Sequence, residues 1–151
     1  MVKAANDSPA RGSGTLANRL RPVLLRLARE LRREIHTLGV TGGQVTLLIQ
    51  IKKHPGITAS ELAEHERISA PGMSGHIARL EAATLIARTR AADRRRIGLT
   101  LTPQGERVLE DVRRRRTAWL AERLKGLTPD ERDAIEAALP ALEKLLEAPT
   151  R

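Results

Sequence analysis

The side chains with the most evident chemistry in this 151-residue chain are arginines, and a compact group of them stands in the run Asp93, Arg94, Arg95, Arg96. A guanidinium group binds phosphate and the edge of guanine, and it gains further energy in a narrow minor groove of DNA. The chain carries 27 Lys and Arg against 18 Asp and Glu, a formal charge of +9. This balance favours a polyanionic partner such as nucleic acid over an acidic small substrate.

Catalytic and metal-binding chemistry have little support in the sequence. The four histidines lie in different segments without a metal-ligand spacing such as HExxH, and neither a nucleophile elbow nor a phosphate-binding loop is present. The chain has no cysteine, which excludes disulfides and thiolate metal sites. Trp119 is the one aromatic residue, which argues against single-strand binding by base stacking. We therefore expect no enzyme, no metal site and no cofactor.

Two short helices joined by a tight turn are predicted in the segment 58–81. Thr58 and Glu61 match the capping-box pattern, in which the hydroxyl and the carboxylate satisfy free backbone N–H groups at a helix start. Ser69 offers an N-cap for the second helix. Such a pair usually carries major-groove recognition. The apolar residues that recur at helical spacing in the second helix, and that we expect to face inward, are Met73, Ile77 and Leu80.

A β-hairpin is predicted directly behind this helix pair. Residues 87–90 form a short strand candidate, and a polar turn follows over 91–95. In 97–101, apolar residues alternate with Gly98 and Thr100, the two-residue period of a half-buried strand. Together with a further capped helix that starts at residue 41, the pattern predicts a mainly α fold with a small β-hairpin wing, a winged helix-turn-helix.

Long apolar stripes at both ends of the chain exceed what the winged unit can cover. Because such stripes need a partner, we expect a C2 homodimer built from the terminal helices. A dimer of this kind places two recognition helices about 34 Å apart, one turn of DNA. The expected parts are a disordered tail (1–14), a dimerisation helix (15–40), the winged helix-turn-helix (41–101) and C-terminal dimerisation helices (102–148).

Three segments resemble the MarR family of bacterial transcription regulators. They are SAPGMSGHIARLE at 69–81, DRR at 93–95 and LTLTPQG at 99–105. The order and spacing of the segments carry the resemblance, which extends over 16–146. It implies a homodimer that binds a pseudo-palindromic operator, usually as a repressor. Many members release DNA when a small phenolic or lipophilic effector binds between the dimer helices and the winged domain.

The residues expected to contact DNA lie on the second helix of the pair and on the wing. The chain departs from the family's pattern at Gly75, where arginine is frequent, at His76, where an aliphatic residue is common, and at Thr84, where glycine usually follows the helix. A helical glycine costs roughly 0.5–1 kcal/mol but lets the backbone approach the groove closely. Asp93 is expected to support the wing by capping its turn or holding an arginine. The predicted DNA-binding residues are Ser69, Gly72, Ser74, Gly75, His76, Arg79, Arg94, Arg95 and Arg96.

Several of these residues also have an interpretation that does not involve DNA. Ser69 serves equally as a simple helix cap, Arg79 as a solvated helix arginine and the wing arginines as a solvated loop. The arginines at 113–116 span more than one helical turn, so most are expected on solvated surface or in dimer pairing. Trp119 is expected in core or dimer packing rather than in effector stacking.

The chain has neither an apolar run of membrane-spanning length nor a signal pattern, so we expect a cytoplasmic protein without membrane association. We interpret it as a homodimeric, sequence-specific regulator of double-stranded DNA. The resemblance adds repression and a small lipophilic or phenolic effector. One alternative is an architectural DNA-binding protein with little sequence preference, and another is a winged module that binds protein. Discrete palindromic sites separate the regulator from the architectural protein.

Overall fold

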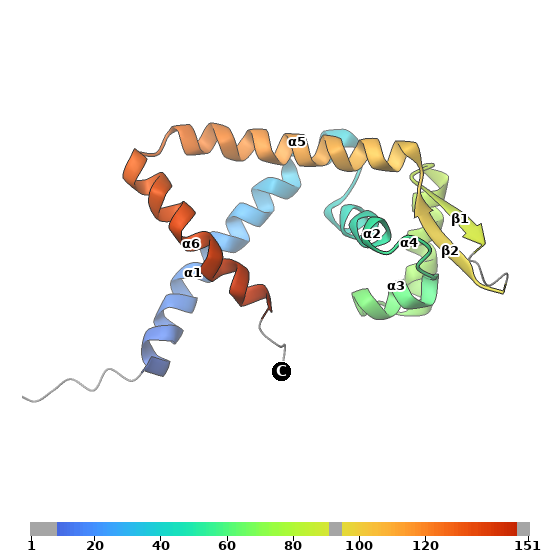
Figure 1. Ribbon diagram of the computed structural model, residues 1–151, viewed down its shortest axis with the longest axis horizontal. Helices are drawn as coiled ribbons and strands as arrows, with labels where there is room; N and C mark the ends of the chain where they lie inside the picture. The colour runs from blue at the N-terminus through green and yellow to red at the C-terminus, as the bar shows by residue number, and fades with distance from the viewer. Residues whose placement is uncertain (1–8, 91–94, 148–151) are drawn as a thin grey trace, which may run out of the picture.

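The computed structural model describes residues 9–90 and 95–147, which form a mostly helical chain with one antiparallel hairpin (Figure 1). The expected fold class is confirmed. The long helix α5 runs along one side and connects the winged unit at one end to α6 at the other. The elements are α1 (Pro9–Arg33), the 3-10 helix η1 (His36–Leu38), α2 (Gly42–Lys53), α3 (Ala59–Glu66), α4 (Ala70–Ala82), β1 (Ile86–Arg90), β2 (Ile97–Leu101), α5 (Pro103–Lys125) and α6 (Pro129–Glu147).

The predicted helix starts are confirmed at the atomic level. Thr41 and Thr58 each close a capping box with the residue three positions on. Ser69 accepts a hydrogen bond from the backbone of the first turn of α4, and Thr102 does the same for α5. Each cap satisfies one of the backbone N–H groups that a helix start leaves without a partner in the helix. Local sequence alone therefore fixes where these four helices begin.

The core of the winged unit joins α2, α3, α4 and the hairpin. The predicted inward face of α4 is confirmed, since Met73, Ile77 and Leu80 are at most 1% exposed. No charged or polar side chain is buried among the described residues. The other fully buried large side chains are Ile35, Val45, Leu48, Ile51, Leu62 and Leu99.

The hairpin is held to the helices by a third backbone segment. Gly56 N–H donates to the Leu99 carbonyl over 2.9 Å, and Leu99 N–H donates to the Ile57 carbonyl over 2.8 Å. Within the ladder, Ile97 pairs with Arg90 at the end nearer the turn. The alternation predicted that Ile97 faces the core with Leu99 and Leu101, but Ile97 is 54% exposed because this end of the ladder extends past the core. Of the three apolar side chains of β2, Leu99 alone is buried.

Helix α1 differs from the expected helix at both ends. It begins at Pro9, so residues 9–14, expected in a disordered tail, are helical. Proline is favoured at the first helical position, and extending a formed helix costs far less than nucleating one, so small residues can be added to an amphipathic segment. The helix ends at Arg33 and a 3-10 turn follows, closed by Gly39 at φ +72°. Pro22 lies inside the helix rather than at its start.

The turn between α4 and β1 uses an unusual residue. Thr84 has φ +59°, a left-handed conformation that costs a β-branched residue energy and that glycine adopts freely. Its hydroxyl lies 2.8 Å from Gln104 Oε1, and its carbonyl accepts from the Thr102 hydroxyl over 2.5 Å. These bonds to the start of α5 compensate for the strained backbone at the position where the family usually has glycine.

Helix α5 is fastened to the N-terminal helices by two neighbouring arginines. Arg115 donates to the Thr37 hydroxyl over 2.5 Å, and Arg116 donates to the Leu31 carbonyl over 3.3 Å. Burial, followed by the nearby Arg32, lowers the pKa of Arg116. Part of the 113–116 run therefore serves contacts within the chain rather than solvent.

The apolar stripes of the terminal helices are uncovered in the single chain. Helix α6 has no buried residue, and its Leu139 is 48% exposed and its Leu146 88% exposed. On α1, Leu16 is 62% exposed. Trp119 on α5 is half-buried and stacks under Arg123, whose guanidinium carbon lies 4.0 Å from the ring centre. None of the described helices is long and apolar enough to cross a membrane.

Candidate nucleic-acid interface

The outward face of α4 is made of small residues and backbone. Ser69 accepts from Gly72 N–H over 3.3 Å, so its hydroxyl acts as the helix cap. A Cβ on Gly72 would lie 3.1 Å from the Ser69 hydroxyl, whereas one on Gly75 would meet nothing within 4 Å. Ser74 is exposed. With no acidic side chain in its first turn, the start of α4 offers backbone N–H groups and hydroxyls suited to a phosphate or a base edge.

His76 and Arg79 form a pair on the same helix. Arg79 Nη2 lies 3.1 Å from His76 Nδ1, and because arginine can only donate, the imidazole accepts at this nitrogen. Arg79 is exposed and His76 is half-buried. The contact orients the guanidinium of Arg79, which is the long basic side chain of α4 and the one best suited to reach a guanine edge or phosphate.

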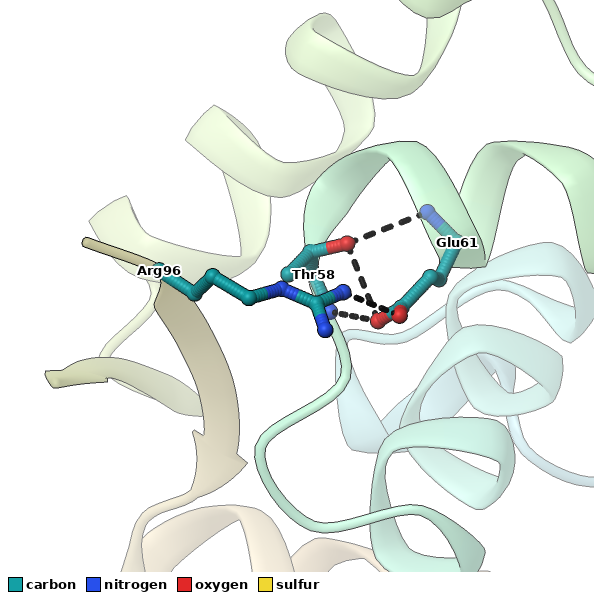
Figure 2. Close-up of polar contacts among 3 residues, drawn as sticks. All are labelled: Thr58, Glu61 and Arg96. Atoms are coloured by element: carbon teal, nitrogen blue, oxygen red, sulfur yellow. Dashed lines mark hydrogen bonds and ion pairs between the residues drawn. The ribbon is translucent and has the colours of Figure 1, made fainter. Parts of the chain in front are cut away.

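The wing residues predicted to bind DNA have different surroundings. Asp93 and Arg94 lie outside the described residues, so their predicted roles stay predictions. Arg95 is exposed. Arg96 forms an ion pair with Glu61 at the start of α3, with its Nη2 donating to Glu61 Oε1 (Figure 2). In the chain without DNA, Arg96 is therefore engaged with the protein itself.

Glu61 is at the centre of a small polar cluster (Figure 2). Its Oε2 accepts from Thr58 N–H over 2.8 Å and from the Thr58 hydroxyl over 3.0 Å, while its own N–H donates to that hydroxyl over 3.2 Å. The Thr58 N–H, then Arg96, then the Thr58 hydroxyl lower the pKa of Glu61 from 4.5 to about 2. All three favour the charged carboxylate.

A carbon-detected NMR titration should show this shift directly. The carboxyl resonance of Glu61 is expected to stay constant from neutral pH down to about pH 3 and to move with a midpoint near 2. Because the pKa is lowered on folding, the contribution to stability is present above 4.5 and is lost as pH falls from there through about 2. In Arg96→Gln the midpoint should rise only part of the way, since the Thr58 N–H remains. A wild-type midpoint near 4.5 would contradict the cluster.

A second ion pair ties the other strand of the wing to the recognition helix. Arg88 on β1 makes two hydrogen bonds to Glu81 on α4, at 2.7 and 3.3 Å. The carboxylate raises the pKa of Arg88. Arg88 thus joins β1 to α4, and Arg96, which directly precedes β2, joins the hairpin to α3.

Sequence reasoning missed Glu61 and Glu81 as partners of the wing. The capping box correctly assigned one oxygen of Glu61, but the other is bound by an arginine 35 positions later. No local pattern encodes that distance along the chain. For Glu81, the only available signal was an acidic residue at the end of α4 shortly before a strand that contains arginines.

A cavity of about 380 Å³ lies between α2 and α5, away from the wing. Its lining combines aliphatic side chains with Lys52, Arg116 and the ion pair of Arg113 with Glu110. Lys52 also bridges the two helices through an ion pair with Glu106 at 2.6 Å. Among residues 9–90 and 95–147, no group of three His, Cys, Asp or Glu side chains is placed to hold a metal ion.

Comparison with known proteins agrees with this architecture. A profile described as the MarR family matches residues 38–97. The HTH-type transcriptional repressor MdtR of Bacillus subtilis is 34% identical over 113 residues, which cover 74% of this chain and 73% of MdtR. A crystal structure described as a transcriptional regulator from Pseudomonas aeruginosa is similar with a TM-score of 0.79 at 31% identity, covering 94% of this chain and 100% of that one.

A more distant structure shares the fold. It is a MepR variant from Staphylococcus aureus bound to an oligodeoxyribonucleotide, with a TM-score of 0.68 at 22% identity, covering 87% of this chain and 97% of MepR. The similarity to MdtR extends over most of both proteins, and the profile match covers the helix-turn-helix and the wing up to β2. The chain therefore belongs to the MarR family of winged helix-turn-helix, DNA-binding transcription regulators.

Proposed function

We propose that this chain is a homodimeric repressor of a palindromic operator. The observation that carries the proposal is the pairing of an exposed, cation-bearing recognition helix with a wing fastened to the helix-turn-helix by two ion pairs. The similarity to MdtR, a transcriptional repressor, supports the direction of regulation. The uncovered stripes of α1 and α6 support a dimer, because leaving so much apolar surface in water is unfavourable.

Selection of bound sequences from random double-stranded DNA tests this function. A dimeric regulator should enrich one palindrome whose half-site centres lie one helical turn, about 10 base pairs, apart. Recovery of no preferred sequence, with binding that collapses as salt rises, would support an architectural role instead. That second candidate is favoured by the small side chains of α4, which leave few groups to read bases. Absence of DNA affinity even at low salt would favour a module that binds protein.

The wing arginines should contribute strongly to operator binding. The double variant Arg94→Ala, Arg95→Ala is expected to bind the selected operator at least tenfold more weakly, since an arginine that reads a groove contributes about 1–3 kcal/mol. Fluorescence anisotropy with labelled operator measures the loss. The variant Lys125→Ala, Lys144→Ala removes the same charge from exposed positions far along the chain and should bind nearly as the wild type does. Equal losses of operator affinity in both variants would mean that the wing arginines act only through the overall charge of the protein.

The cavity between α2 and α5 supports a small effector as a further part of the proposal. Its volume of about 380 Å³ falls within the range of ligand pockets. It separates a helix of the winged unit from a helix expected at the dimer interface, so a ligand there can favour one spacing of the recognition helices over another. Aliphatic walls that also carry charged side chains of both signs suit a lipophilic molecule with a polar group such as a phenol. Repeating the selection with such compounds present tests the response.

A further inference from the structure

Glu61 bears a charge at a position where the helix cap needs only an amide. The chain contains three capping boxes of the same form, at Thr41 and Gln44, at Thr58 and Glu61, and at Thr128 and Glu131. In the first, Thr41 N–H donates to Gln44 Oε1 over 2.9 Å, and in the second, Thr58 N–H donates to Glu61 Oε2 over 2.8 Å. A glutamine therefore closes this cap as a glutamate does. Because both residue types close such a cap, the cap alone does not explain why residue 61 is a glutamate rather than a glutamine.

The second oxygen of Glu61 supplies that explanation. Oε2 serves Thr58, whereas Oε1 accepts from Arg96, which directly precedes β2 (Figure 2). The two oxygens of one carboxylate thus serve separate parts of the molecule. We call the ion pair of Arg96 with Glu61 the wing tie, because it joins the first helix of the helix-turn-helix to the wing.

The wing tie lies where the hairpin has little other support. Backbone hydrogen bonds fix β2 at Leu99, in the middle of the strand. Ile97, in the last pair of the ladder, is 54% exposed, whereas Leu99 is 1% exposed. Arg96 is the next residue toward the turn, so its ion pair adds a side-chain link at the end where apolar packing is weak.

We propose that Glu61 is a positioning residue for DNA binding, which holds Arg96 and thereby fixes the backbone next to β2, including Arg95, against the helix-turn-helix. The inference rests on the proposed function, since Arg95 is one of the proposed groove contacts. Consecutive Cα atoms are about 3.8 Å apart, so an anchor at residue 96 directly restricts the backbone of Arg95. Anchoring the wing before DNA binds lowers the entropy lost on binding.

A simple electrostatic role for Glu61 predicts the opposite sign. If its carboxylate only repelled DNA phosphates, removing the charge would tighten binding to any sequence. If it positions the wing, removing the charge weakens binding to the operator and leaves non-specific binding equal or stronger. The two roles are therefore distinguished by one substitution.

The test compares Glu61→Gln with Glu122→Gln in the full chain. The first keeps the cap, as Gln44 does in its own box, and loses the ion pair. The second removes the same charge from an exposed pair with Lys125 on α5. Glu61→Gln should weaken operator binding roughly tenfold, the order expected for one mispositioned arginine, with non-specific binding unreduced. Glu122→Gln should change neither. Unchanged or tighter operator binding in Glu61→Gln overturns the proposal.

A double-mutant cycle with Arg96→Gln identifies the partner through which Glu61 acts. Once Arg96 is replaced, adding Glu61→Gln should cost no further affinity. If Glu61→Gln causes the same loss of operator affinity in the Arg96→Gln background as in the wild type, the wing tie is not the cause of that loss.

Backbone order parameters from NMR give a readout that needs no DNA. Amides of Arg96 and Ile97 should fall from about 0.85 toward 0.6 in Glu61→Gln and stay rigid in Glu122→Gln. Rigid amides in Glu61→Gln would overturn the proposal. A wild type that selects no DNA site contradicts the proposed function separately, and the order parameters then decide the wing tie.

Discussion

The double variant Leu27→Arg, Leu139→Arg is expected to be a folded monomer that binds the operator at least a hundredfold more weakly than the wild type. Both residues are partly exposed in the single chain, at 41% and 48%, and neither belongs to the winged core, which therefore loses nothing. Because less than half of each leucine is exposed in the single chain, a dimer gains about 0.7–1.5 kcal/mol from each, and a symmetric dimer of the variant loses four such contributions. The sum, about 3–6 kcal/mol, weakens the dimer by at least about a hundredfold.

The DNA effect follows from losing the second half-site. Two linked recognition helices bind a palindrome about 10²–10⁴ times more tightly than one. Sedimentation velocity at micromolar concentration measures the mass, and anisotropy measures operator affinity. The matched control Asn18→Arg, Ala137→Arg places the same groups at exposed positions on the opposite faces of α1 and α6 and should stay dimeric. A wild type that sediments as a folded monomer would contradict the dimer at once.

The variant Gly105→Ala is expected to lose roughly 3 kcal/mol of folding free energy, in the upper part of the range for overpacking. Gly105 lies in the first turn of α5, pressed against the turn that follows α4. A Cβ at this position would lie 2.1 Å from the Leu85 carbonyl oxygen, which itself accepts from Thr102 N–H over 3.1 Å. Neither backbone segment can move away without breaking the hydrogen bond from Thr102 N–H to the Leu85 carbonyl. The midpoint of thermal unfolding should fall by about 6–12 °C.

The same substitution at Gly75 is the control, with the opposite expected sign. Nothing lies within 4 Å of a Cβ there, so alanine should raise stability by roughly 0.5–1 kcal/mol through helix propensity. Differential scanning calorimetry on both variants makes the comparison. If Gly105→Ala unfolds at the wild-type temperature, close backbone contact is not the reason for glycine at this position.

Local patterns in the sequence predicted what local physics determines. The caps at Thr41, Thr58, Ser69 and Thr102 depend on residues at most three positions apart, and all four are found. The inward face of α4 follows from helical periodicity for the same reason. The winged fold was predictable because these short-range signals occur in one order along the chain.

Features that depend on distant contacts were not predictable. The wing tie joins residues 35 positions apart, and the exposure of Ile97 depends on where the core ends rather than on its own alternation. The start of α1 was predicted too late in the chain. Composition indicates the helix propensity of a segment, but it does not show that a helix already formed next to that segment can extend into it. For the candidate site, the sequence predicted DNA contacts on α4 and at the wing arginines, which stay predictions, and it did not indicate the glutamates that pair with Arg88 and Arg96.

Trp119 is an intrinsic fluorescent probe of this protein. It is the only tryptophan, and the chain has no tyrosine or phenylalanine, so excitation near 295 nm and near 280 nm reports a single indole. Its ring lies under Arg123 and lines a hollow of about 440 Å³ with Val23 and Leu27 of α1. Emission from this residue therefore records water access at the α1–α5 seam, and the proposed dimerisation can be followed in real time without attaching a dye.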